Sequence, residues 1–290
     1  MVRPVGEGIA VAVVGHVEWV EFARVKRVPL PGEIIQAADS WQEPAGGGAV
    51  AAVQLAKLAG AATLFTALGD DHIGRQVPEG LASHGVRVAA AFRPTPQRKA
   101  FTFVDTAGER TITTMAKRLD VSLDEPLPWG DLARADAVYL TAGDVGAVQA
   151  ARRARVLVAT SRVLDRLQEA GVPLDALVGS GRDPGERYTP GDLNPPPRLV
   201  VVTAGSAGGS FELPGVRSGS YLPAPLPGPI VDAYGCGDSF AAGLTYGLGI
   251  GLDAEDALRL AARCGAACLT GRGPYEGQLT LKDLGAGSPR

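Results

Sequence analysis

Asp232-Ala-Tyr-Gly-Cys-Gly-Asp-Ser-Phe240 is the most informative stretch of this chain, and it runs directly into an Ala/Gly-rich segment that predicts a helix over 238–248. Gly235 and Gly237 permit backbone angles that turn successive N–H groups toward one point. The start of the helix adds its unpaired amides and the positive end of its dipole. The stretch therefore predicts a phosphate site, with Asp238 beside it to accept a proton from an attacking hydroxyl.

A simpler interpretation of Asp238 is a helix N-cap, a position that Asp occupies very commonly. A glycine-rich turn followed by a capping Asp would explain these residues without any ligand. Taken alone, the short motif favours this simpler interpretation, so the surrounding sequence has to decide.

Short apolar runs alternate with helical stretches along most of the chain. A helix rich in Ala is expected over 49–59, and Ile73, Val77 and Leu81 recur at the spacing of another helix. A further helix is expected over 254–269. The predicted strands are 9–14, 63–67, 137–140, 156–159, 176–178 and 199–203. Helical stretches separate the three strands 137–140, 156–159 and 176–178 from one another. Such alternation predicts an α/β fold with a mostly parallel sheet and helices on both faces.

A second, smaller sheet is expected from two separated parts of the chain. The runs 101–105 and 110–115 flank the turn Thr106-Ala-Gly-Glu109, which is typical of a β-hairpin. Together with 18–25 and 34–41 they would form a small β lid. We therefore expect one domain over 1–290, with a discontinuous lid from about 17–41 and 98–115 inserted in it.

Composition narrows the functional classes. The chain has 290 residues, 46% of them hydrophobic, a net charge of −3 and a pI near 5.7, which favours neither nucleic acid nor a membrane as a partner. From its odd number of cysteines we expect no disulfide framework, and from its apolar pattern we expect neither an apolar leader nor a membrane-spanning stretch. A cytoplasmic location is expected. We expect Cys264 and Cys268 to be small buried residues and not metal ligands. The three histidines, His16, His72 and His84, are expected to be structural or surface residues.

The segment DAYGCGDSFAAGL resembles the C-terminal signature of the PfkB family of carbohydrate kinases, the ribokinase-like enzymes, whose usual form is D-T-x-G-A-G-D-x-F. Further segments are similar to landmarks of that family, in the same order: Pro31-Gly-Glu33, Gly46-Gly47 with 58–61, Gly69-Asp-Asp71 to Gly74, 102–112, 202–208 and 254–277. The resemblance covers residues 9–284. It implies a ribokinase-like three-layer sandwich with a central, mostly parallel sheet and a small β lid.

The resemblance also implies roles for individual residues. Gly235, Cys236 and Gly237 would form the anion hole and Asp238 would be the catalytic base. ATP with Mg²⁺ would be the phosphoryl donor, and K⁺ is a further candidate ion. The residues implied for the nucleotide side are Thr203, Gly205, Gly208, Gly237 and Asp232, where Asp232 would organise the loop beside a monovalent cation or simply cap a turn.

Departures from the family pattern fall on the acceptor and metal side. Ala51 replaces the usual Asn, and Glu18 stands in for the usual Asp. Ser180 and Asp183 occupy the Asn-x-x-Glu positions, so Asp183 is the implied metal residue, acting through water. Residues 159–162 replace the usual Asp-x-Asn segment. The residues implied on the acceptor side are Glu18, Gly46, Gly47, Ala51, Arg110 and Asp238.

Two arginines, Arg98 and Arg110, bracket the predicted hairpin. Either side chain could pair with an anionic group on a substrate, but an exposed lid charge is the expectation for each taken singly.

Three functions remain open at this stage. The leading prediction is an ATP-dependent kinase that transfers the γ-phosphoryl group to a hydroxyl of a small sugar or sugar derivative. The alternatives are a nucleoside kinase of the same family and a non-catalytic sugar- or nucleotide-binding regulator that retains the fold. An exposed lid face also suggests a homodimer through the lid.

Overall fold

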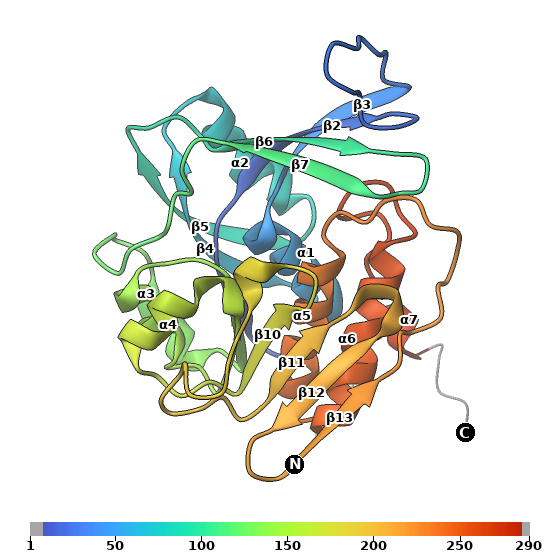
Figure 1. The fold of residues 1–290 in the computed structure, drawn as a ribbon. Helices are drawn as coiled ribbons and strands as arrows, with labels where there is room; N and C mark the ends of the chain where they lie inside the picture. Colours follow the sequence, from blue (N-terminus) through green and yellow to red (C-terminus); the bar gives the residue numbers. More distant parts are fainter. Residues whose placement is uncertain (1–7, 286–290) are drawn as a thin grey trace.

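A mostly parallel sheet of nine strands forms the centre of residues 8–285, the part of the chain that this computed structural model describes (Figure 1). Its order is β13-β12-β11-β10-β9-β8-β1-β4-β5. The strands from β11 to β5 pair in parallel, and β12 and β13 form an antiparallel edge. The bounds are β1 (Val11–Val14), β4 (Ala62–Gly69), β5 (Val86–Arg93), β8 (Ala137–Leu140), β9 (Val156–Thr160), β10 (Ala176–Ser180), β11 (Val200–Thr203), β12 (Gly209–Leu213) and β13 (Arg217–Tyr221).

Strand β1 shows why continuous apolar runs mark the central strands. Val11 and Val13 belong to one hydrophobic cluster, whereas Ala12 and Val14 belong to another. Successive side chains of a strand point to opposite faces, so both faces of β1 are covered and neither tolerates polar residues.

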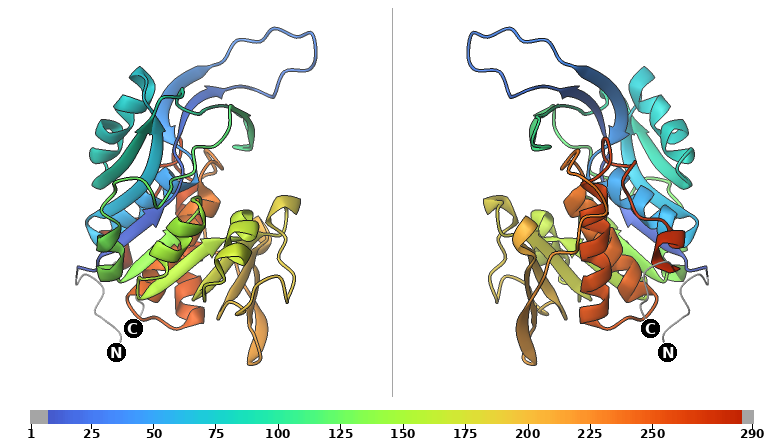
Figure 2. Two further views of the ribbon diagram at one scale, coloured as in Figure 1. Left: turned by 90° about the vertical axis from the view of Figure 1, so that its left-hand side faces the viewer. Right: turned by 90° about the vertical axis from the view of Figure 1, so that its right-hand side faces the viewer.

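Helices cover the two faces of this sheet, which gives three layers (Figures 1 and 2). On one face lie α1 (Gly47–Ala59), α2 (His72–Ala82), α5 (Cys236–Gly249) and α6 (Ala254–Cys268), with α7 (Leu281–Gly285) against α1. On the other face lie η1 (Trp129–Arg134), α3 (Val145–Ala151), η2 (Ser161–Val163) and α4 (Leu164–Ala170). Two short turns of helix, η3 (Pro184–Glu186) and η4 (Gly205–Ala207), follow β10 and β11. The predicted α/β sandwich with a central parallel sheet is confirmed.

A four-stranded lid sheet stands above the carboxyl ends of the central strands (Figures 1 and 2). Its order is β3-β2-β6-β7, and β2 pairs with β6 in parallel. The bounds are β2 (Glu18–Arg24), β3 (Asp39–Ala45), β6 (Lys99–Val104) and β7 (Arg110–Met115). The pair β2 and β3 and the pair β6 and β7 come from segments that are far apart in the sequence, and the parallel pairing of β2 with β6 joins them.

The predicted strand 34–41 is right only at its end, because β3 runs from Asp39 to Ala45 and residues 34–38 lie outside it. Pairing runs from Glu18 opposite Ala45 to Arg24 opposite Asp39, so β2 has no residues left to pair with 34–38. That segment forms part of a protruding loop in which Ile34 is fully exposed. Ile34 made the sequence of this segment look like a strand, although residues 34–38 have no partner strand to pair with.

Three strands and two helix starts differ from the expectations. The helix expected over 49–59 begins two residues earlier, at Gly47. Strands β5, β12 and β13 were not predicted, because Arg, Gly and Ser interrupt the apolar alternation that identifies strands. The helix expected at residue 238 begins two residues earlier, at Cys236.

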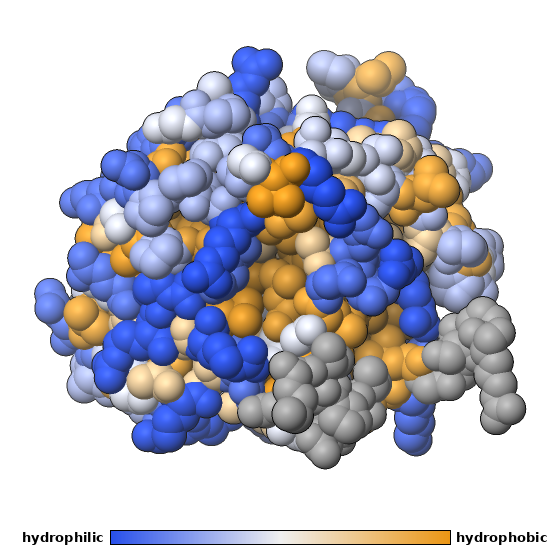
Figure 3. Space-filling model, turned by 90° about the horizontal axis from the view of Figure 1, so that it is seen from below, coloured by the Kyte–Doolittle hydropathy of each residue, from blue (hydrophilic) through white to orange (hydrophobic). Residues whose placement is uncertain are grey.

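The face opposite the lid has a different character. Figure 3 shows apolar side chains gathered near its centre and hydrophilic side chains around them. Charged and polar residues such as His16 and Glu186 follow the carboxyl ends of the parallel strands, on the lid side, where open α/β sheets bind their ligands.

Candidate active site

The glycine-rich loop ends in an abrupt start to α5. Gly235 has φ 80° and precedes the first helical residue, Cys236. No side chain caps this helix, so the amides of its first turn have no acceptor from a cap or from the helix itself. Asp238 lies within that first turn, which excludes the N-cap interpretation. Unpaired amides and the helix dipole make this end of α5 suited to a phosphate.

The carboxylate of Asp238 is packed against the first turn of α1. A Cβ atom at Gly47 would lie 2.9 Å from Asp238 Oδ1, so only glycine allows this close approach. Burial, and after it the negative charge of Glu186, raises the pKa of Asp238 to about 6, against the opposing charges of Arg110 and Arg162. A carboxyl with this pKa is largely ionised at neutral pH and is a stronger base than an ordinary Asp.

Asp232 anchors the glycine-rich segment 232–237, which we call the phosphate loop. It is completely buried; one carboxylate oxygen accepts from the Tyr234 amide at 2.8 Å and the other from the Gly273 amide at 3.1 Å. The Tyr234 hydroxyl in turn accepts from the Gly46 amide at 3.2 Å. Asp232 therefore joins the phosphate loop to the loop after α6, and Tyr234 joins it to the turn before α1. Burial raises the pKa of Asp232, while these two amide hydrogen bonds lower it.

A cavity of about 520 Å³ opens beside this loop. Its polar part comes from the phosphate loop and from the β11–β12 connection, and its apolar part comes from α6 and the segment after β13. The lining includes Arg110, Arg182, Thr203, Gly205, Gly208, Tyr221, Leu226, Ile230, Cys236, Gly237, Phe240 and Ala262. Thr203, Gly205, Gly208 and Gly237, which the sequence placed on the nucleotide side, all line it. We call this space the nucleotide cavity.

On the other side of Asp238, Glu18 and Arg98 form a nearly buried ion pair. Arg98 Nε lies 2.9 Å from Glu18 Oε1, and their side chains are 15% and 8% exposed. Burial raises the pKa of Glu18, and Arg98 opposes this. The expectation of an exposed lid charge is therefore wrong for Arg98. Arg110 is exposed, but it lines the nucleotide cavity and not this acceptor side.

His16 lies in the site although the sequence indicated only a structural or surface role. A Cβ atom at Gly47 would lie 3.5 Å from the His16 ring, and His16 Nε2 is 3.9 Å from Glu18 Oε1. Burial, followed by the positive charges of Arg118, Arg98 and Arg162, lowers the pKa of His16 to about 3. The ring is thus neutral and sits in a positive field. Its position directly after the first central strand was the available signal.

Other predicted acceptor-side residues are placed unequally. Gly46 and Gly47 line the turn between Glu18 and Asp238. Ala51 is completely buried in the main hydrophobic cluster and lines neither of the two large cavities. The structure gives this side chain no surface for a ligand.

Beyond β10, the structure brings Glu186 toward Asp238 in place of Asp183. Glu186 is 15% exposed on its side chain, accepts from the Ser180 amide at 2.8 Å and pairs with Arg162 at 2.5 Å. Asp183 is 39% exposed, accepts from the Gly185 amide at 2.8 Å and also pairs with Arg162. Of these two acidic residues, Glu186 and not Asp183 is among the charges that raise the pKa of Asp238. An acidic residue beyond the carboxyl end of a parallel strand was the signal for Glu186, but it lies outside the expected four-residue spacing.

Within residues 8–285, no three His, Cys, Asp or Glu side chains are arranged to hold a metal ion together.

Comparisons with known proteins agree with this geometry. The model of the pfkB family of carbohydrate kinases matches residues 9–176 and 193–281. An ATP-dependent ribose-1-phosphate kinase of Halopiger xanaduensis is 31% identical over 274 residues, covering 87% of this chain and 89% of the relative. The crystal structure of Arabidopsis thaliana ribokinase with ribose and ATP has a TM-score of 0.74 at 20% identity, covering 97% of this chain and 98% of that one. Adenosine kinase of Sinorhizobium meliloti has a TM-score of 0.77 at 19% identity, covering 97% and 99%.

The two solved structures are less than 25% identical to this chain, so they establish the fold and do not choose between a sugar and a nucleoside. The family match spans nearly the whole chain and includes the phosphate loop with Asp238. The chain belongs to the pfkB family of carbohydrate kinases, and it is a sugar kinase: a phosphotransferase with an alcohol group as acceptor.

Proposed function

We propose that this protein transfers the γ-phosphoryl group of ATP to a hydroxyl of a small sugar, with Asp238 as the catalytic base. The observation that carries the proposal is the meeting of two features at one point. The first turn of α5 presents amides without acceptors, and the carboxylate of Asp238 in the same turn is raised to a pKa of about 6. The amides neutralise the charge on the phosphoryl group in transfer, and the carboxylate accepts the proton of the attacking hydroxyl.

The nucleotide cavity supports the donor side of the proposal. Its apolar walls, from Leu226, Ile230 and Phe240 among others, suit the flat base, while Gly205, Gly208 and Gly237 allow phosphates to approach the backbone. Mg²⁺ would be held by the phosphates and, through water, by Glu186. Its charge would draw electron density from the phosphates and ease the departure of ADP.

Ribose 1-phosphate is the first acceptor to test. The relative that covers most of this chain at 31% identity carries the name of a ribose-1-phosphate kinase. The acceptor side also contains a positive field at His16 from three arginines, Arg118, Arg98 and Arg162. A neutral sugar would gain nothing from that field.

A screen of ADP release tests this function. Purified protein is supplied with Mg²⁺-ATP and a panel of free sugars, sugar phosphates and nucleosides. We expect turnover with ribose 1-phosphate above that with ribose. Phosphorylation of adenosine or cytidine without sugar turnover would assign a nucleoside kinase. Thermal stabilisation by ligands without any ADP release would assign a binding protein.

Three finer properties belong to the same proposal. K⁺ would bind beside Asp232, a homodimer would form through the lid, where Ile112 and Met115 are exposed, and the protein would act in the cytoplasm. Rates in K⁺ and Na⁺ buffers and light scattering test the first two. In residues 8–285 no helix is long and apolar enough to cross a membrane.

A further inference from the structure

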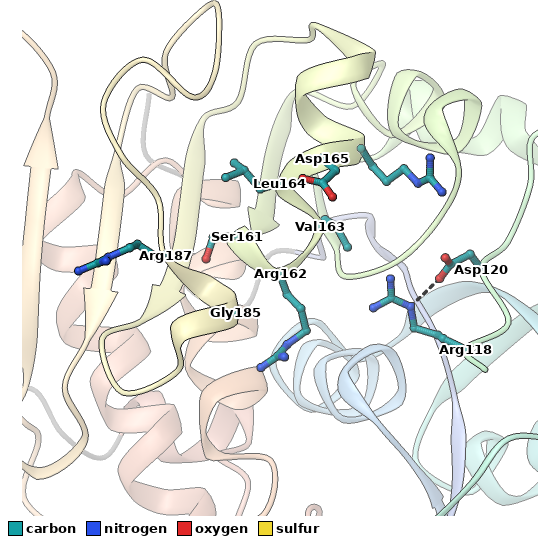
Figure 4. A pocket seen from close by; sticks show the side chains of 10 residues that line it. Arg118, Asp120, Ser161, Arg162, Val163, Leu164, Asp165, Gly185 and Arg187 are labelled. Carbon is teal, nitrogen blue, oxygen red and sulfur yellow. Dashed lines mark hydrogen bonds and ion pairs between the residues drawn. The ribbon is translucent and has the colours of Figure 1, made fainter. Parts of the chain in front are cut away.

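A second cavity, of about 510 Å³, lies between the start of α4 and the chain that leaves lid strand β7 (Figure 4). Four arginines and two aspartates line it, together with small and apolar residues. The charged members are Arg118, Arg162, Arg166, Arg187, Asp120 and Asp165. A cavity this rich in guanidinium groups suits an anion, and phosphate is the anion whose oxygens match their paired donors.

Arg118 is the best placed of these arginines. Its Nε lies 2.6 Å from Asp120 Oδ1, so the ion pair uses the inner nitrogen and orients the side chain. Figure 4 shows the two outer nitrogens of Arg118 directed into the space between it and Arg162. In contrast, Arg187 points away from that space in the same view. Two parallel N–H donors on a fixed planar group are the arrangement that binds a phosphate bidentately.

The field of this cavity reaches the acceptor side of the active site. Arg118 and Arg162, with Arg98, are the three charges that lower the pKa of the His16 ring. The ring in turn lies 3.5 Å from the Cβ position of Gly47, which is 2.9 Å from Asp238 Oδ1. Arg162 also influences Asp238 directly, whereas Arg118 is not among the charges that do. Arg118 and Arg162 line the same cavity, and Arg162 also pairs with Glu186, whose charge acts on Asp238.

We propose that Arg118, assisted by Arg162, binds a phosphate group that the acceptor already carries, so that a hydroxyl at the other end of the same molecule reaches Asp238. This inference rests on the proposed function and deepens it by naming the substrate class, a phosphorylated sugar. The hydroxyl oxygen bonds to the γ-phosphorus as the bond between that phosphorus and the β–γ bridging oxygen breaks. Asp238 takes the hydroxyl proton, ADP leaves, and the product is a sugar bisphosphate.

Arg162 contributes less than Arg118 to binding the phosphate, because its guanidinium already forms ion pairs with carboxylates. It pairs at 2.5 Å with both Asp183 and Glu186, so its positive charge is largely neutralised by carboxylates. Arg118 has one carboxylate partner in the part of the chain that the structure describes. Arg118 also follows β7 directly, so a phosphate bound there would connect the acceptor to the lid.

The test compares Arg118→Gln with Arg166→Gln. Arg166 lines the same cavity, but it is 51% exposed and pairs with Glu169 on its own helix, so it serves as the matched control. Initial rates are measured for ribose 1-phosphate and for ribose, at saturating ATP, and KM for ATP is measured separately. Arg118→Lys is included because it keeps the charge and loses the paired donors.

For Arg118→Gln we expect KM for ribose 1-phosphate to rise at least about tenfold, as for the loss of a charge-assisted bidentate contact. KM for ATP and kcat/KM for ribose should stay within about twofold of the wild type. Arg118→Lys should lie between, and Arg166→Gln should match the wild type. Binding of ribose 1-phosphate to the Asp238→Asn protein, with and without Arg118→Gln, measures the same loss without turnover.

Two results overturn the inference and can be told apart. If the wild type uses ribose 1-phosphate and Arg118→Gln leaves its KM unchanged, or impairs ribose equally, then Arg118 does not hold the phosphate while the proposed function survives. If the wild type phosphorylates ribose and rejects ribose 1-phosphate, then the phosphorylated acceptor itself is wrong.

Discussion

Replacing Asp238 by Asn should separate the catalytic role of this carboxylate from its cost to the fold. Asn keeps the size of the side chain and cannot accept the proton of the hydroxyl. We expect turnover to fall by at least about two orders of magnitude, as for loss of a general base. The assay measures kcat/KM for ribose 1-phosphate as a function of pH, for the wild type and for Asp238→Asn.

The structure sets the pH range of this effect. With a pKa of about 6, Asp238 is about 90% ionised at pH 7 and about 10% ionised at pH 5. Because only the ionised form is a base, wild-type kcat/KM should be half-maximal near pH 6. Below that pH it should fall about tenfold for each pH unit.

The same pKa predicts an opposite effect on stability. The folded state holds the proton of Asp238 more tightly than the unfolded chain, whose Asp has a pKa of 3.8, so Asp238 lowers stability as pH rises from about 4 to about 6. A shift of about 2 units corresponds to at most about 3 kcal/mol of destabilisation above pH 7. Asp238→Asn removes this cost, so the variant should unfold at a higher temperature than the wild type at pH 8 and at a similar one near pH 4.

Kinetics and thermal unfolding at pH 4, 6 and 8 check both predictions, the pH dependence of kcat/KM and the pH dependence of stability. Wild-type turnover in Asp238→Asn, or a flat wild-type profile between pH 7 and pH 5, would remove Asp238 from the mechanism. A variant that is less stable than the wild type at pH 8 would show that the carboxylate is stabilised by contacts and not strained by burial.

Three further substitutions probe the remaining parts of the site. Glu186→Gln should lower kcat about tenfold or more and raise the Mg²⁺ concentration needed for half-maximal rate, whereas Asp183→Asn should stay within about threefold of the wild type; equal effects in a Mg²⁺ titration would contradict the choice of Glu186. Gly47→Ala places a Cβ atom 2.9 Å from Asp238 Oδ1 and should reduce kcat by about one to two orders of magnitude at nearly unchanged ATP affinity, measured by steady-state kinetics. Cys236→Ala should keep kcat within about twofold, because the anion contact comes from the backbone amide; a large loss at unchanged stability would assign a role to the thiol.

The architecture followed from local patterns in the sequence. Runs such as 9–14 can be buried on both faces only in a parallel sheet with helices on each side, and the observed β1 divides its side chains between two clusters. The phosphate loop was equally readable, because Gly235 and Gly237 act through their own backbone. Where the pattern was interrupted, as in β12 and β13, or had no partner, as around Ile34, the prediction failed.

The chemistry of the acceptor side was decided by tertiary structure. Periodicity and turn composition act over a few residues, so they predicted most of the central strands, the lid hairpin and a helix that starts close to Asp238. The convergence of His16, Glu186 and Arg118 depends instead on how three loops fold after three different elements, and no local preference encodes those distances. Burial and the mutual fields of these charges then set their protonation, which is why only the folded chain distinguishes Glu186 from Asp183.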